Sequence, residues 1–149
     1  MPPGSERLTL ELTRTLPAPP AVVFAAFTDS NELAKWWGPE GLETGKVDFA
    51  PQVGDGYRIE MQPPEGDAFY IRGEFREVDP PARLAFTFAY EEPDRDDVEN
   101  LVVLAFRDLD GSTEATLTQG PFRTEPRRAL HHDGWSDSFD KLERLISAG

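Results

Sequence analysis

Histidine is the side chain best suited to metal binding and proton transfer near neutral pH, and this chain contains two, His131 and His132. They are neighbours in a segment with helical periodicity, so their side chains diverge. A pair four residues apart could chelate one ion from one helix face, but this pair cannot. The sequence has no cysteine, which excludes disulfides, thiolate nucleophiles and thiolate metal sites. We therefore expect no metal site.

Two further segments resemble motifs of catalysis or phosphate binding but lack essential residues. Gly134–Ser138 contains serines near a glycine, yet it lacks the second glycine of the nucleophile elbow and lies within a predicted helix. Gly41–Lys46 ends like a phosphate-binding loop, but the first glycine is missing, Val47 replaces serine or threonine, and a strand follows. We therefore expect no catalytic residues and no cofactor.

The chain is acidic, with a formal net charge of -13, which disfavours nucleic acid and anionic membrane surfaces as partners. Its densest acidic run, from Glu91 to Glu99, lacks the calcium-loop pattern and its central glycine, so we interpret it as a solvated hairpin tip. Residues 1–14 do not resemble a signal peptide, and no apolar run has membrane-spanning length. We expect a cytoplasmic protein without membrane insertion.

The elements that must position any site follow from hydrophobic periodicity. Alternation over residues 8–12 predicts an opening strand. A short helix is expected within residues 22–27, and Asp29 has the position of a cap for a second short helix. Gly38 and Pro39 would end that second helix.

Later segments predict a sheet and a long final helix. Six more strands are expected within residues 47–49, 57–61, 69–75, 84–90, 102–106 and 115–119. Short turns between them imply antiparallel neighbours. In the final segment, residues 124–149, Trp135, Phe139 and Leu142 recur at helical intervals, so one helix face must cover the sheet. At 149 residues the chain fits a single α+β domain, residues 1–149.

Several short segments are similar to those of a known family: Val22–Asp29, Trp36–Pro39, Gly73–Phe75, Glu77–Val78, Pro80–Pro81, Gly134–Trp135 and Leu142. With them, nearly the whole chain resembles the activator-of-heat-shock-chaperone-ATPase-like branch of the START/SRPBCC superfamily. The resemblance implies a helix-grip fold, in which a curved seven-stranded antiparallel sheet wraps around a long C-terminal helix and two short helices separate strands 1 and 2. Many members of the superfamily have a cavity for a hydrophobic ligand between sheet and helix.

The aromatic content favours a cavity independently of the resemblance. Ten Phe, three Trp and three Tyr can fill the space between sheet and helix or line it. A curved sheet has more concave surface than one helix covers, so we expect a pocket of roughly 300–1,000 Å³. Because Trp36 and Trp37 are neighbours on a helix, one can face the pocket while the other packs beneath the loop. The expected ligand-binding residues are Trp36, Trp37, Tyr57, Ile59, Met61, Phe69, Ile71, Phe75, Phe86, Phe88, Leu104, Phe106, Leu117, Trp135 and Phe139.

Three functional hypotheses follow from this pattern. The first is a carrier or sensor, monomeric or homodimeric, that binds a small hydrophobic or aromatic molecule in the cavity. An alternative is an enzyme of the polyketide cyclase or aromatase kind, in which Tyr57, Gln119 or His132 supplies a proton. The third, a chaperone-interacting regulatory module, is suggested by the name of the family branch.

Overall fold

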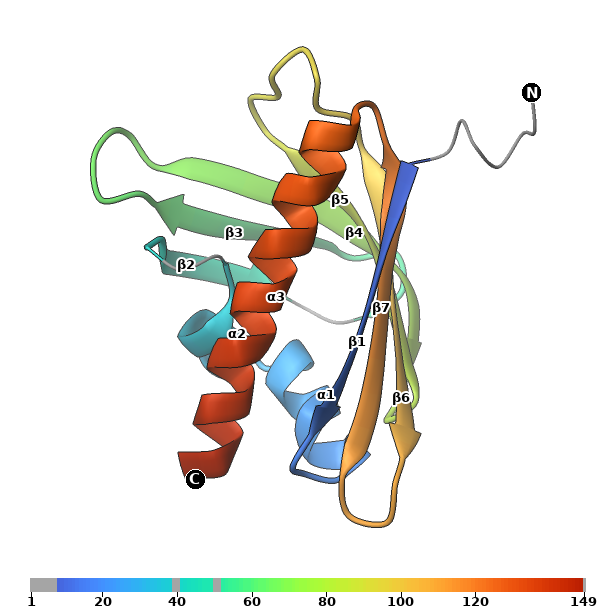
Figure 1. Cartoon of the computed structure of the whole chain (residues 1–149). Coiled ribbons are helices and arrows are strands. Elements are labelled where there is room, and N and C mark those ends of the chain that lie inside the picture. Colours follow the sequence, from blue (N-terminus) through green and yellow to red (C-terminus); the bar gives the residue numbers. More distant parts are fainter. Residues whose placement is uncertain (1–7, 39–40, 50–51, 149) are drawn as a thin grey trace, which may run out of the picture.

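The computed structural model describes residues 8–38, 41–49 and 52–148. A seven-stranded antiparallel sheet curves around one long helix, with two short helices at one end (Figure 1). The predicted α+β helix-grip architecture is confirmed, including the two short helices between the first two strands. The predicted domain also includes residues 1–7 and 149, which lie outside the described residues. Pro39, which was predicted to end the second short helix together with Gly38, lies outside them as well.

The last five strands each follow their sheet neighbour through a hairpin, whereas two helices separate the first strand from the second. The sheet order is β1-β7-β6-β5-β4-β3-β2, so β1 pairs with the last strand and the two edges are β1 and β2. Inward and outward residues alternate along β3 and β7, as the period-two pattern predicted. The strands are β1 (Leu8–Leu16), β2 (Glu43–Phe49), β3 (Gly56–Gln62), β4 (Phe69–Asp79), β5 (Arg83–Tyr90), β6 (Asn100–Asp108) and β7 (Thr113–Phe122).

The three helices are α1 (Pro20–Thr28), α2 (Ser30–Trp36) and α3 (Glu125–Ala148). The Asp29 carboxylate accepts hydrogen bonds from the backbone N–H groups of Asn31 and Glu32, which confirms the predicted cap of α2. Helix α3 packs along β1 and against α2. Among the described residues, no helix combines the length and apolarity that crossing a membrane requires.

Aromatic rings fill the end of the interior where α1 and α2 pack. Phe27 lies 4.6 Å from the ring of Trp36, 5.3 Å from Phe106 and 6.2 Å from Phe139, measured between ring centroids. The Trp36 indole is fully buried, and its Nε1–H donates to the carbonyl oxygen of Ala26 at 3.0 Å. This end of the space between sheet and α3 is therefore solid.

Gly73, in the middle of β4, has no side chain, and a side chain from the neighbouring strand occupies the space above it. It pairs with Tyr57 on β3, and the Tyr57 hydroxyl donates across β4 to the carbonyl oxygen of Thr87 on β5 at 2.6 Å. A Cβ at Gly73 would lie 1.9 Å from that oxygen and 2.6 Å from the Tyr57 ring. The glycine therefore leaves room for Tyr57, which covers its bare backbone.

Replacing this glycine should destabilise the fold. We expect Gly73→Ala to lower the free energy of unfolding by about 3 kcal/mol, because the clashing oxygen belongs to the backbone and cannot rotate away. Urea denaturation followed by circular dichroism measures the change. The matched control is Gly56→Ala on β3, where a Cβ would make one ordinary contact at 3.4 Å, so the change should stay within about 1 kcal/mol. Equal losses in the two variants would contradict this explanation of Gly73.

Candidate functional site

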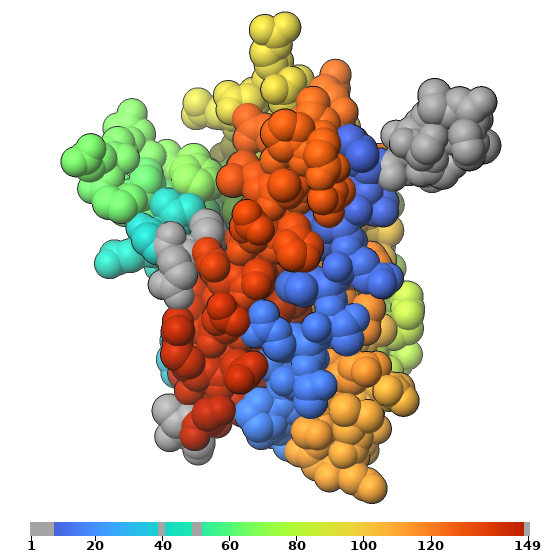
Figure 2. All heavy atoms as spheres, in the orientation of Figure 1, coloured from blue at the N-terminus to red at the C-terminus, as the bar shows by residue number. Residues whose placement is uncertain are grey.

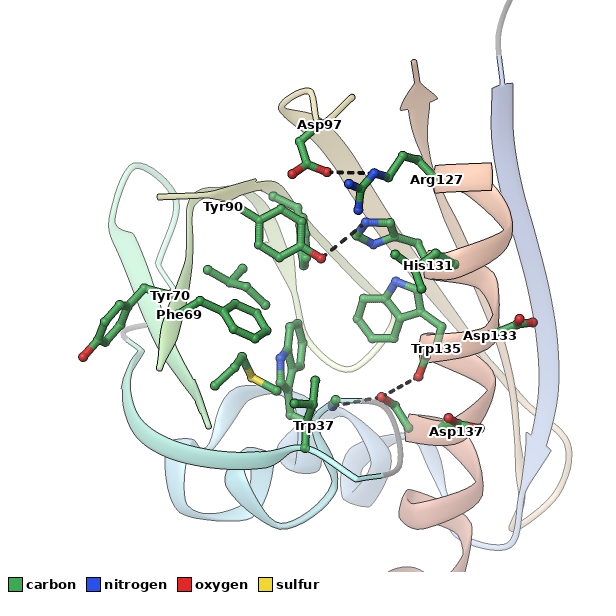
Figure 3. Close-up of a pocket in the computed structure, with 18 of the residues that line it drawn as sticks. Trp37, Phe69, Tyr70, Tyr90, Asp97, Arg127, His131, Asp133, Trp135 and Asp137 are labelled. Atoms are coloured by element: carbon green, nitrogen blue, oxygen red, sulfur yellow. Dashed lines mark hydrogen bonds and ion pairs between the residues drawn. The ribbon is translucent and has the colours of Figure 1, made fainter. Parts of the chain in front are cut away.

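The other end of the interior is hollow. A cavity of about 520 Å³ lies between the first half of α3, strands β3 to β5 and the segment that follows α2. In Figure 2, the β3–β4 hairpin (green) lies to the left of the upper half of α3 (orange), and the β5–β6 loop (yellow) lies above it. Figure 3 shows that aromatic side chains from the sheet and from α3 point toward one another across this space. The rings therefore fill one end of the interior and line the other.

The fifteen predicted ligand-binding residues divide between these two ends. Six line the cavity: Trp37, Met61, Phe69, Ile71, Phe88 and Trp135. Nine others lie in the packed core, outside the described lining: Trp36, Tyr57, Ile59, Phe75, Phe86, Leu104, Phe106, Leu117 and Phe139. Alternation along a strand shows which residues face inward, but it does not show at which end of the strand the interior is hollow.

Trp135, on α3, is fixed by a chain of buried hydrogen bonds. Its Nε1–H donates to Gln119 Oε1 at 2.7 Å, and Gln119 Nε2 donates to Asn100 Oδ1 at 2.8 Å. Gln119 is only 1% exposed, so both of its amide atoms are satisfied within the protein. Because the single polar atom of the indole is held in this way, the rest of its surface is left for apolar contacts. The Trp135 ring meets Trp37 edge-on, with 5.1 Å between centroids.

The segment after α2 is tied to α3 through Ser138. The Ser138 hydroxyl accepts from the backbone N–H of Gly38 and donates to the carbonyl oxygen of Gly134, each at 3.0 Å. The carbonyl oxygen of Trp37 in turn accepts from the Thr44 hydroxyl at 2.9 Å. These bonds hold Trp37 against the cavity, while its neighbour Trp36 packs into the core.

His131, which the sequence interpretation set aside with His132, lies in the cavity wall. The rings of Phe88, Tyr90 and Phe122 surround it at centroid distances of 5.4, 5.8 and 5.0 Å. Its Nε2 shares a hydrogen bond of 3.4 Å with the Tyr90 hydroxyl. Burial lowers the pKa of His131 to about 4, although nearby Asp97 acts in the opposite direction. Burial also raises the pKa of Tyr90 to about 12, so both groups are neutral at pH 7.

The acidic run is more than a solvated hairpin tip, because part of it is held against α3 at the cavity. Arg127 pairs with Asp94 through Nη2 at 3.0 Å and with Asp97 through Nε at 3.5 Å. The Asp97 side chain is only 10% exposed. A signal for these residues was present in the sequence, because Arg127, His131 and Trp135 follow one another at intervals of four and share a helix face.

The proton donors named for the cyclase alternative lie away from the described cavity lining. The Tyr57 hydroxyl is engaged by Thr87, and burial raises the pKa of its phenol. Gln119 belongs to the hydrogen-bond chain behind Trp135, and the side chain of His132 is 37% exposed beside Asp133. Within the part of the chain that the structure describes, no group of three His, Cys, Asp or Glu residues could hold a metal ion.

The partly buried His131 should titrate abnormally. Because the sequence contains two histidines, a ¹H NMR titration follows two ring resonances, which the variants His131→Phe and His132→Phe assign. We expect the His131 resonance to titrate near pH 4. Between this value and the unfolded value of about 6.5, the unfolded chain binds more protons, so stability falls as pH falls, by at most about 1.4 kcal/mol per pH unit.

Urea midpoints at pH 7 and pH 5 test the same group independently. His131→Phe should lose less stability than the wild type over this window, whereas His132→Phe should behave like the wild type. A His131 resonance that titrates near pH 6.5 would show that the ring is solvated.

Comparison with known proteins places the chain in a family. Residues 17–147 match the sequence profile of the Activator of Hsp90 ATPase homolog 1-like proteins. A comparison with curated proteins gave no significant match.

Solved structures extend the likeness over almost the whole chain. A protein of Chromobacterium violaceum is 27% identical, with 93% of this chain and 96% of that one covered and a TM-score of 0.83. A Nitrosomonas europaea protein is 26% identical, with 95% of each chain covered and a TM-score of 0.80. A Silicibacter pomeroyi protein is 25% identical, with 94% and 98% covered and a TM-score of 0.83. The chain therefore belongs to the Activator of Hsp90 ATPase homolog 1-like family.

Proposed function

We propose that the protein binds a small apolar or aromatic molecule in the cavity beside α3, as a carrier or sensor. The observation that carries this proposal is a hollow of about 520 Å³ beside a core that is otherwise densely packed. Its volume lies within the usual range of small-molecule sites, about 300–1,000 Å³. A concave site of this size with a mostly apolar lining and a few polar groups is typical of small-molecule binding sites.

The lining suits a molecule with a flat or branched apolar body. Trp37 and Trp135 form a corner of two rings, and Ile71 and Met61 continue the apolar surface along the sheet. Contacts with such rings contribute through buried area and through edge-to-face geometry. We therefore place the apolar body of the ligand against this corner.

The pair formed by Tyr90 and His131 offers a polar contact beside this apolar surface. Both groups are neutral at pH 7, so the pair can donate to or accept from a hydroxyl, carbonyl or amine of the ligand. Such a contact would orient the ligand, whereas the apolar surface would supply most of the affinity. Binding, not turnover, is the function that this arrangement favours.

A neutral fluorescent probe tests the proposal. N-phenyl-1-naphthylamine should bind the wild type at one site, with fluorescence that rises on transfer to an apolar environment. Ile71→Trp should weaken binding at least about tenfold, because the larger side chain occupies the cavity and displaces the probe. The matched control is Leu101→Trp, which adds the same side chain at a position that is 39% exposed on β6, outside the described lining.

Native mass spectrometry of freshly purified protein, followed by organic extraction, provides the second measurement. A bound mass of a few hundred daltons that is absent from Ile71→Trp would support the proposal. If the wild type binds no probe and carries no ligand, or if folded Ile71→Trp binds as tightly as the wild type, the proposal is wrong.

A further inference from the structure

The charges around the cavity are strongly unbalanced. The residues of its described lining include one arginine, Arg127, and five acidic residues. The net charge of these groups is therefore -4 at neutral pH. A cleft with charge of one sign and low-dielectric walls concentrates the electrostatic potential and attracts ions of the opposite sign. The acidic residues are Glu92, Asp94, Asp97, Asp133 and Asp137, of which Asp133 directs its carboxylate away from the cavity (Figure 3).

The cationic groups in this lining are already engaged or neutral. Arg127 is paired with two carboxylates, those of Asp94 and Asp97. His131 would carry a charge only well below neutral pH, because burial lowers its pKa to about 4. Within the described lining, the anionic head of a fatty acid or other carboxylate would have to compete with Asp94 and Asp97 for Arg127. An anionic ligand is therefore disfavoured.

The aromatic part of the lining favours a cation for a separate reason. The faces of aromatic rings carry partial negative charge and attract ammonium groups, an interaction that strengthens where water is excluded. Figure 3 shows Asp97 and Arg127 at the same end of the cavity as the rings of Tyr90 and His131. A ligand amine at this end would lie near both ring faces and carboxylates. The rings in the lining are those of Trp37, Phe69, Phe88, Tyr90, His131 and Trp135, whereas the Tyr70 ring points away from the cavity (Figure 3).

From this distribution we propose that the ligand of the cavity is a cationic amine, either protonated or quaternary, with an aromatic or aliphatic body. The body lies against Trp37 and Trp135, and the amine lies at the acidic end near Asp97. This inference rests on the proposed function and adds to it the charge of the ligand, for which the apolar surface alone gives no preference.

Three probes that share a biphenyl group and differ in their polar group test the charge preference: biphenylmethylamine, biphenylmethanol and biphenylcarboxylate. Displacement of N-phenyl-1-naphthylamine measures their affinities. At 0.1 M salt we expect the amine to bind about tenfold more tightly than the carboxylate, with the alcohol between them. At 1 M salt the Debye length falls to about 3 Å, so the ratio of amine to carboxylate affinity should shrink toward one.

A pair of double variants separates the charge at the cavity from the charge of the whole protein. Asp94→Asn with Asp97→Asn should reduce the ratio of amine to carboxylate affinity at least about threefold at 0.1 M salt, because it removes the two carboxylates that pair with Arg127, and it should change the affinity for the alcohol less. The control is Asp108→Asn with Asp110→Asn, which removes the same charge at the β6–β7 turn. Figure 1 shows this turn at the opposite end of the molecule from the β5–β6 loop, so the control should keep the wild-type ratio.

The outcomes distinguish this inference from the function on which it rests. If neither N-phenyl-1-naphthylamine nor any of the three probes binds, both are wrong. If N-phenyl-1-naphthylamine binds and none of the three displaces it, ligand binding stands and the cationic preference is wrong. If the alcohol binds but the amine has no advantage over the carboxylate at 0.1 M salt, ligand binding stands and the cationic preference is wrong. The same conclusion follows if both double variants change the ratio equally. If the cavity variant does not fold, the salt dependence of the wild type decides.

Discussion

One helix, about 10 Å across, cannot cover the concave face of a curved seven-stranded sheet. This mismatch of areas explains the distribution of the side chains in the interior. At one end, α1 and α2 add a second set of rings, and Phe27 and Trp36 close the space against Phe139 of α3. At the other end, only the first half of α3 faces the sheet, and the cavity remains. The solid core and the hollow site are thus two results of the same geometric constraint.

Hydrogen bonds fix the position of α3 relative to the sheet and to the segment that follows α2. The chain from Trp135 through Gln119 to Asn100 links α3 to β7 and β6, and Ser138 links α3 to the backbone at Gly38. Each of these groups is buried and paired, so shifting the helix would leave polar atoms without partners. A hollow interior tends to collapse when its walls can move, and these bonds oppose that movement.

Much of the fold could be predicted from local patterns, because strand alternation, the Asp29 cap and the stripe on α3 are properties of short segments. The split between Trp36 and Trp37 was also expected, since neighbours on a helix diverge. The position of the hollow end was not predictable. It depends on where α1 packs against β6, for example through Phe27 and Phe106, which are far apart in the sequence. The pair between Arg127 and Asp94 joins residues 33 apart in sequence, and no short motif marks it.

The packed end and the hollow end of the interior differ in how well they tolerate changes in side-chain size. In the packed end, adding or removing one methylene group disturbs the packing of the surrounding rings. In the hollow end, side chains that line the cavity have open space on one side, so a change of size or polarity there perturbs fewer neighbours. The residues of the cavity lining can therefore change at a smaller cost in stability than those of the packed end. The shape and polarity of this cavity can thus be altered by substitution while the scaffold keeps its geometry.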